Sequence, residues 1–207
     1  MSKIKISIVV IVTILLSYSC STTKSSVRPT VRIASDLIHQ NGVRKIITEP
    51  VELEIGDASY EFYLTLNSHT RSKKYALGVG STWKIQKNNI LLLKLTNNET
   101  IKLTASSAAV EKVNMPKDIT ILGGKQTGLS INRKVDYYSA LFDIDANVLD
   151  DIAKQGIIKM RIEYDDTFFE QNWWSNELGK YITASRKTVD EQLKKPNKAT
   201  TPIEDGF

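Results

Sequence analysis

Apolar and polar residues alternate along much of the first two thirds of the chain, which is the pattern of β-strands with one solvent-exposed face. The Asn-Asn pairs at 88–89 and 97–98 suit tight hairpins between such strands, because asparagine tolerates a positive φ. The run from Ile90 to Leu93 is apolar on both faces, which predicts a central position for that strand. The pattern predicts an antiparallel meander with strands at residues 51–55, 60–66, 76–86, 90–96 and 100–104.

The spacing of apolar residues changes in the last third of the chain, where helical periods appear between strands. The predicted elements are a strand at 137–144, a helix capped by Asp145 and ended by a left-handed Gly156, a strand at 158–164, and a helix from Ser175 or Asn176 to Leu193. We therefore predict an α+β fold. It consists of an antiparallel β-meander or sandwich-like sheet with two helices in the C-terminal third, packed on one side or end of the sheet.

The organisation of the chain follows from where this patterning starts and stops. It is nearly continuous over residues 31–195, which predicts a single α+β domain there. Residues 20–30 are polar and rich in Ser and Thr, as in a flexible tether. Residues 196–207 are polar and lack periodicity, which predicts a disordered tail. A length of 207 residues, with 41% hydrophobic and 25% charged residues, agrees with one globular domain.

Residues 1–19 have the features of a secretory signal peptide. Lys3 and Lys5 precede an apolar run, Ile6–Leu16, whose 11 residues are too few to span a bilayer. Cys20, the only cysteine, follows. This arrangement resembles the lipobox of bacterial lipoproteins, in which the thiol is acylated and becomes the mature N-terminus, although the leucine lies four residues before the cysteine rather than three. The alternative is an unlipidated secreted protein, cut before Cys20 by the ordinary signal peptidase.

The strand–helix–strand segment at 138–162 (YSALFDIDANVLDDIAKQGIIKMRI), together with the richness in Ile, Lys and Asn, is similar to small uncharacterised cell-envelope lipoproteins of the Bacteroidota. The resemblance implies a palmitate-type lipid anchor on Cys20 in the cell outer membrane, and it carries no other residue roles. In that group, acidic residues just after the cysteine tend to mark export to the cell surface, and residues 21–30 contain none. We therefore expect the periplasmic face of the outer membrane rather than the cell surface.

Charge and composition narrow the function classes. Without Lys3 and Lys5 the net charge falls from +5 to +3, and the basic residues are scattered. Nucleic-acid binding typically needs a basic stripe with interleaved aromatics, so we set that class aside. One cysteine and two histidines, His39 and His69, exclude a disulfide scaffold and a zinc cluster. No cofactor or metal is predicted, and both histidines are expected at the surface.

The catalytic motifs in the chain are incomplete. The GGKQTG segment at 123–128 lacks the spacing of a phosphate-binding loop and is interpreted as a connecting loop. No Gly-x-Ser-x-Gly elbow occurs. The neighbouring carboxylates Asp150-Asp151 and Asp165-Asp166 diverge by local geometry, so we interpret them as a solvated helix face and a turn. A glycosidase-like pair of carboxylates brought together from distant segments stays open as an alternative.

One aromatic cluster stands out, and it consists of Phe168, Phe169, Trp173 and Trp174. Large aromatic residues most often anchor a core, and here they would pack the C-terminal helix onto the sheet. Adjacent side chains along a strand point to opposite faces, so one of the two tryptophans is expected to be partly exposed. Exposed aromatics beside Gln171 and Asn172 would suit a sugar-stacking platform or a contact with a protein.

Two functions from different classes follow. The first is a membrane-anchored envelope lipoprotein without catalytic activity, a binding or assembly module held by its N-terminal lipid and contacting an envelope protein or a glycan. The second is an exported polysaccharide or cell-wall hydrolase whose carboxylates are assembled by the fold. The absence of a complete catalytic motif in the sequence favours the first.

Overall fold

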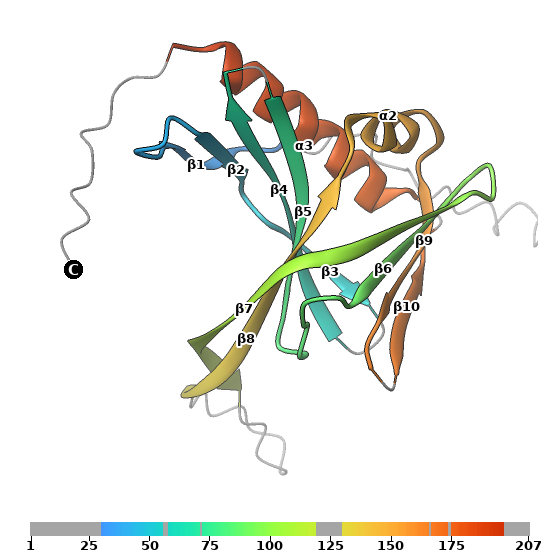
Figure 1. Ribbon diagram of the computed structural model, residues 1–207. Coiled ribbons are helices and arrows are strands. Elements are labelled where there is room, and N and C mark those ends of the chain that lie inside the picture. Colours follow the sequence, from blue (N-terminus) through green and yellow to red (C-terminus); the bar gives the residue numbers. More distant parts are fainter. Residues whose placement is uncertain are drawn as a thin grey trace, which may run out of the picture.

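The computed structural model of the protein describes residues 30–55, 58–70, 72–118, 130–165, 167–173 and 175–196 (Figure 1). The predicted signal peptide, Cys20, nearly all of the predicted tether, the 123–128 segment and nearly all of the predicted tail lie outside these residues. Within them the elements are β1 (Ile33–Ile38), β2 (Arg44–Thr48), β3 (Val51–Ile55), β4 (Ala58–His69), β5 (Ser72–Ser81), β6 (Ile90–Leu95), β7 (Thr100–Asp118), β8 (Ser130–Ile144), α2 (Ala146–Gln155), β9 (Ile157–Glu163), β10 (Phe168–Asn172) and α3 (Glu177–Lys194).

All ten described strands belong to one antiparallel sheet, in the order β1-β2-β4-β5-β8-β7-β6-β9-β10. β3 lies beside the first half of β4, and β2 lies beside its second half. β7 joins the two parts of the sheet, because its first residues pair with β6 and the rest pair with β8. Figure 1 shows the resulting curvature, with β6, β9 and β10 turned across from β4 and β5, and both helices at one end.

The architecture agrees with the α+β prediction in outline, although strands dominate it. The meander is wrong in two respects. β5 has β8, not β6, as its second neighbour. The strand predicted at 76–86 ends at Ser81, and residues 82–86 do not continue it. β6 instead lies between β7 and β9, so both its edges are paired, as its two-sided apolar sequence predicts. Three strands, β1, β2 and β10, were not predicted, because they are short and mix polar with apolar residues. β7 also continues well beyond the predicted end at residue 104.

The predicted turns and helix ends agree with the backbone in part. Asn88 and Asn98 have the positive φ expected of them, 75° and 70°. The hairpin at 97–98 is confirmed, because β6 and β7 pair across it, whereas the hairpin at 88–89 is wrong, because β5 and β6 are not neighbours in the sheet. Asp145 is the N-cap residue of α2, and Gly156 is its C-cap. Gly156 has φ 75° and ψ 169°, outside the left-handed helical region that was expected and in a region accessible almost only to glycine.

The hydrophobic core lies between the inner face of the sheet and the helices. Alternate residues of β4 point inward, and four of them are 0% exposed: Tyr60, Phe62, Leu64 and Leu66. α3 covers this face, contacts β2, β4, β9 and α2, and buries Leu178, Tyr181, Ile182 and Val189. Burial of such side chains is the dominant favourable contribution to folding.

A buried hydroxyl pair ties α3 to the sheet. The Tyr181 hydroxyl donates to the Glu49 carbonyl oxygen at 2.6 Å and lies 3.0 Å from the Thr48 hydroxyl. Because a phenol has one hydrogen, the Thr48 hydroxyl must be the donor in the second contact. Thr48 Oγ1 in turn accepts the backbone N–H of Leu64 at 2.9 Å. Every polar atom in this chain of contacts is therefore satisfied inside the protein.

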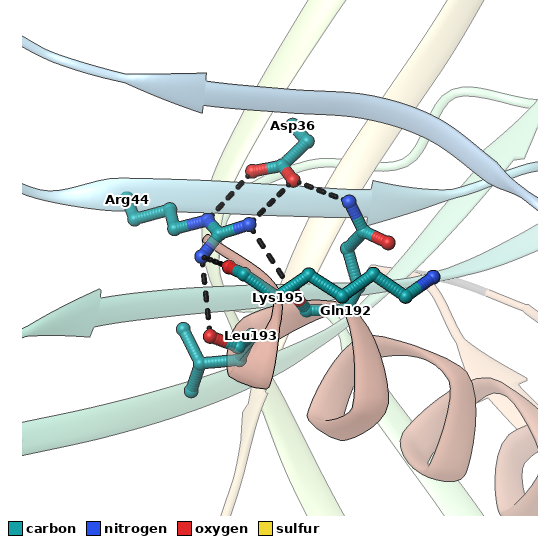
Figure 2. A network of polar contacts seen from close by, with 5 residues as sticks. All are labelled: Asp36, Arg44, Gln192, Leu193 and Lys195. Carbon is teal, nitrogen blue, oxygen red and sulfur yellow. Dashed lines mark hydrogen bonds and ion pairs between the residues drawn. The ribbon is translucent and has the colours of Figure 1, made fainter. Parts of the chain in front are cut away.

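The C-terminal end of α3 is fastened to the β1–β2 hairpin by Arg44 (Figure 2). The Arg44 guanidinium makes two hydrogen bonds of 2.8 Å to the Asp36 carboxylate. Its remaining donors reach the carbonyl oxygens of Gln192, Leu193 and Lys195, at 3.0 to 3.2 Å. The hydrogen bond from Arg44 lowers the pKa of Asp36 below its usual value. Asp36 also accepts the Gln192 side-chain amide at 2.7 Å, and the Gln192 carbonyl also accepts the Lys195 N–H. Arg44 thus neutralises a carboxylate and supplies donors to the carbonyls at the end of α3.

Candidate functional site

The aromatic residues singled out in the sequence separate into different environments. Trp173 is 8% exposed and belongs to the core, and its backbone N–H donates to the Ile158 carbonyl oxygen at 2.8 Å. It therefore has the packing role that is most common for such residues. Trp174 lies outside the described residues. Phe168 and Phe169 are neighbours on β10, so their side chains point to opposite faces of the sheet.

Phe169 lies on the inner side, in a cluster of four aromatic rings. Its ring centroid is 4.5 Å from that of Trp83, 5.7 Å from that of Tyr164 and 6.3 Å from that of Tyr60, in tilted or edge-to-face geometry. The hydroxyls of Tyr60 and Tyr164 are 2.9 Å apart. Burial raises the pKa of both phenols above the ordinary value, so both stay protonated at neutral pH. The cluster is therefore a packing unit whose outer edge is Trp83, 46% exposed.

Phe168 points to the outer side and is 53% exposed. Its ring lies against the Arg161 guanidinium, whose central carbon is 4.3 Å from the ring centroid. Such a cation–π contact orients the arginine without removing its hydrogen-bond donors from solvent. Phe168 is thus exposed, unlike Phe169 and Trp173, the other described members of the predicted cluster, and its ring contacts a positively charged side chain.

Next to Phe168 the outer face of the sheet has a shallow depression of about 220 Å³, which we call the cationic hollow; it is lined by Leu92, Lys94, Thr100, Lys159, Arg161 and Glu170. These residues come from β6, β7, β9 and β10, all of which present alternate side chains to this face. The strand register places Lys94 directly opposite Lys159, and Leu92 opposite Arg161. On the other side of β6, Leu92 faces Lys102.

Glu170 is the single acidic residue that lines the cationic hollow. Its Oε1 lies 2.6 Å from Lys159 Nζ, and its Oε2 lies 2.6 Å from an Arg161 nitrogen. Hydrogen bonds from Lys159 and then Arg161 lower the pKa of Glu170. A lowered pKa keeps this carboxyl ionised at neutral pH, so it is unsuited to act as a general acid there. In the described part of the chain, Lys94 and Lys102 have no such carboxylate partner.

The remaining carboxylates proposed from the sequence do not converge. Asp150 pairs with Arg186 of α3 at 2.5 Å, and Asp151 lies exposed on α2. Asp165 is exposed between β9 and β10, and Asp166 lies outside the described residues. Asp190 accepts the Tyr75 hydroxyl at 2.8 Å, and burial, with that contact, raises the pKa of Tyr75 to about 12. Asp150 and Asp190, which was not singled out in the sequence, thus join α3 to α2 and to β5, whereas Asp151 and Asp165 face solvent separately.

A second group of polar residues covers the outer face of β4, β5 and β8. The Tyr137 hydroxyl donates to Glu61 Oε2 at 2.5 Å, and its ring lies over Gly80, while the Tyr63 ring lies over Gly78. Each glycine thus leaves room for an aromatic ring that packs flat on the sheet. Burial, followed by Glu61, raises the pKa of Tyr137 above its usual range. The arrangement supports the sheet by packing two aromatic rings against its outer face.

Among the residues that the structure describes, no group of three or more His, Cys, Asp or Glu side chains could hold a metal ion. His39 and His69 are both exposed, as expected. Neither of the two described helices is long and apolar enough to cross a bilayer.

The cationic hollow was not predicted from the sequence. The alternating Lys159, Arg161 and Glu163 mark a wet face of one strand, and Lys94 and Lys102 lie on two others. Nothing in the local pattern indicates that these strands are neighbours. The usable signal is Leu92, an apolar residue on the half-buried outer face of β6, where it forms part of the lining of the depression.

Comparisons of the chain with protein-family descriptions, with curated proteins and with solved structures find no match.

Proposed function

We propose that the protein is a lipid-anchored envelope lipoprotein that acts as a non-catalytic binding or assembly module and contacts its partner through Phe168 and the adjoining cationic hollow. The observation that carries the proposal is the half-exposed Phe168 ring against Arg161, which lines the cationic hollow. Aromatic and arginine side chains contribute most of the binding energy in many protein interfaces. In this proposal the sandwich-like sheet, with both helices at one end, holds Phe168 and the cationic hollow in position.

The alternative, an exported hydrolase, has less support. Retaining and inverting glycosidases need two carboxylates about 5 to 10 Å apart across a cleft, one of them with a raised pKa. Asp36 and Glu170, by contrast, have lowered pKa values and are held by arginine or lysine. Asp150 and Asp190 share Arg186 as an ion-pair partner at the junction of α2 and α3. This use of carboxylates is typical of structural ion pairs.

The contact surface is tested by crosslinking in intact cells, followed by mass spectrometry. We expect wild-type protein to capture a recurrent envelope partner, protein or glycan, and Phe168→Ala to lose most of that capture. Ile38→Ala is the matched control, because Ile38 is 54% exposed on β1, at the opposite edge of the sheet. Equal capture by wild type and Phe168→Ala would contradict the surface, and release of reducing sugar from a cell-wall polymer by the purified protein would contradict the non-catalytic role.

The anchor is tested separately by Cys20→Ala. Because the lipid would be the membrane attachment, the variant should move from the membrane fraction to the soluble fraction while its circular dichroism stays that of the wild type. Ser21→Ala, which leaves the thiol in place, should remain in the membrane fraction. Retention of Cys20→Ala in membranes would rule out lipidation at this residue as the attachment.

A further inference from the structure

We infer that the cationic hollow binds an acidic sugar residue, so that the partner of the proposed binding module is an anionic glycan. The inference rests on the proposed function and names its ligand. Three cationic side chains, Lys94, Lys159 and Arg161, line the hollow against one acidic side chain, Glu170. Lys102, which faces Leu92 across β6 and β7, adds a fourth positive charge beside it.

The charges of the hollow are incompletely balanced within the chain. Lys94 and Lys159 are directly opposite in the register of β6 and β9, an arrangement in which like charges repel. Glu170 compensates Lys159 and Arg161 from β10, the next strand, and Glu163 on β9 lies 3.9 Å from a second Arg161 nitrogen. No ion pair to Lys94 is formed by the carboxylates of the described chain. An anionic group between Lys94 and Lys159 would turn this repulsion into two attractive contacts.

The apolar and hydroxyl groups of the site favour a sugar over a simple anion. Leu92 contributes a half-buried apolar surface, Thr100 contributes a hydroxyl, and Phe168 presents an exposed ring beside Arg161. The apolar C–H face of a sugar ring can contact Leu92 and Phe168, and its hydroxyls can hydrogen-bond with Thr100. Inorganic phosphate would engage the cations and leave Leu92 and Phe168 uncovered. A uronic acid combines the ring with the required carboxylate.

The size of the hollow sets how much of a glycan it takes. Its volume of about 220 Å³ is below the range of about 300 to 1,000 Å³ that is usual for pockets of drug-sized ligands. A single acidic sugar ring therefore occupies it, and the rest of the chain runs over the open sheet surface. Affinity for one site of this kind is modest, and a polymer with repeated acidic residues gains from rebinding.

The test is calorimetric titration of the purified full-length protein in detergent with galacturonic acid oligosaccharides. The same oligosaccharides as methyl esters provide the neutral control. We expect binding of the acid and not of the ester, and weakening as salt rises, because screening acts on exposed charges. Lys94→Gln should weaken binding about two- to fivefold, whereas Glu170→Gln, which removes the competing carboxylate, should tighten it by a similar factor. Lys187→Gln removes an exposed charge on α3 and should leave binding unchanged.

Three results would overturn the inference: equal binding of acid and ester, no change in Lys94→Gln, or binding to anionic phospholipid vesicles with none to the oligosaccharide. If one of these occurs while Phe168-dependent crosslinking in cells persists, the acidic sugar is wrong and the binding function stands. If the crosslinking fails as well, both are wrong. Opposite shifts in Lys94→Gln and Glu170→Gln are not expected from a purely structural effect, which would weaken binding in both.

Discussion

Arg44→Met is expected to lower the free energy of unfolding by about 2–4 kcal/mol, since it removes the charged donor of a partly buried carboxylate and the Arg44 hydrogen bonds to the Leu193 and Lys195 carbonyls. The Asp36 carboxylate then keeps only the neutral Gln192 amide as a side-chain donor, at 2.7 Å. The side chains of Arg44 and Asp36 are only 12% and 14% exposed, so water can replace the lost contacts only in part. Urea unfolding followed by circular dichroism measures the change. Lys187→Met removes an exposed i,i+4 pair with Glu191 and should cost less than about 0.5 kcal/mol. Similar losses in the two variants would contradict the role given to Arg44.

The same ion pair makes stability depend on pH in a defined direction. The folded pKa of Asp36 is lowered, so its contribution is present above the unfolded value of about 3.9 and is lost as the pH falls through the folded pKa. The stability difference between wild type and Asp36→Asn should therefore be constant near neutral pH and shrink in acid, below about pH 4. A difference that grows on acidification would show that Asp36 is not stabilised by Arg44.

Gly156→Ala is expected to destabilise the fold by about 2–4 kcal/mol, for two reasons that act at the same atom. The backbone at Gly156, with φ 75° and ψ 169°, costs a residue with a Cβ about 1–3 kcal/mol. An added Cβ would also overlap the Asn176 side chain. That side chain accepts the Ile157 N–H at 2.6 Å and would have to move.

Gly42→Ala separates the two causes. Gly42 also has a positive φ, 77°, but the nearest atom to an added Cβ is His69 Nε2 at 3.9 Å, an ordinary contact. This variant should therefore lose only the backbone contribution, about 1 kcal/mol. Thermal or urea unfolding of both variants gives the comparison. Equal losses would mean that the contact between Gly156 and Asn176 contributes nothing.

Only part of the candidate site could be predicted from local sequence patterns. The sequence draws attention to the aromatic residues around position 170, and the exposed Phe168 is one of them. The sequence leaves open which of these aromatics point outward, because β10 is too short to show an alternating pattern. Trp173, which follows the strand, packs in the core, so its role in partner contact has no support from its position. The lysines and the arginine that complete the site come from separate strands.

The sequence by itself determined the features that depend on neighbouring residues: the Asn turns, the alternation of β3 and β4, the paired edges of β6, and the strand–helix–strand segment from β8 to β9 with Asp145 and Gly156 at the helix ends. Backbone preferences and side-chain period act over a few residues, so a local pattern carries them.

Only the tertiary structure decided that β5 lies beside β8 and that β9 lies beside β6. Strand pairing depends on which inner faces can be buried together once distant segments meet, and any antiparallel partner satisfies the same backbone hydrogen bonds. That choice brings Lys94 opposite Lys159 and Arg44 onto the end of α3. The cationic hollow and the contacts of Arg44 with the end of α3 therefore exist only once the sheet has assembled.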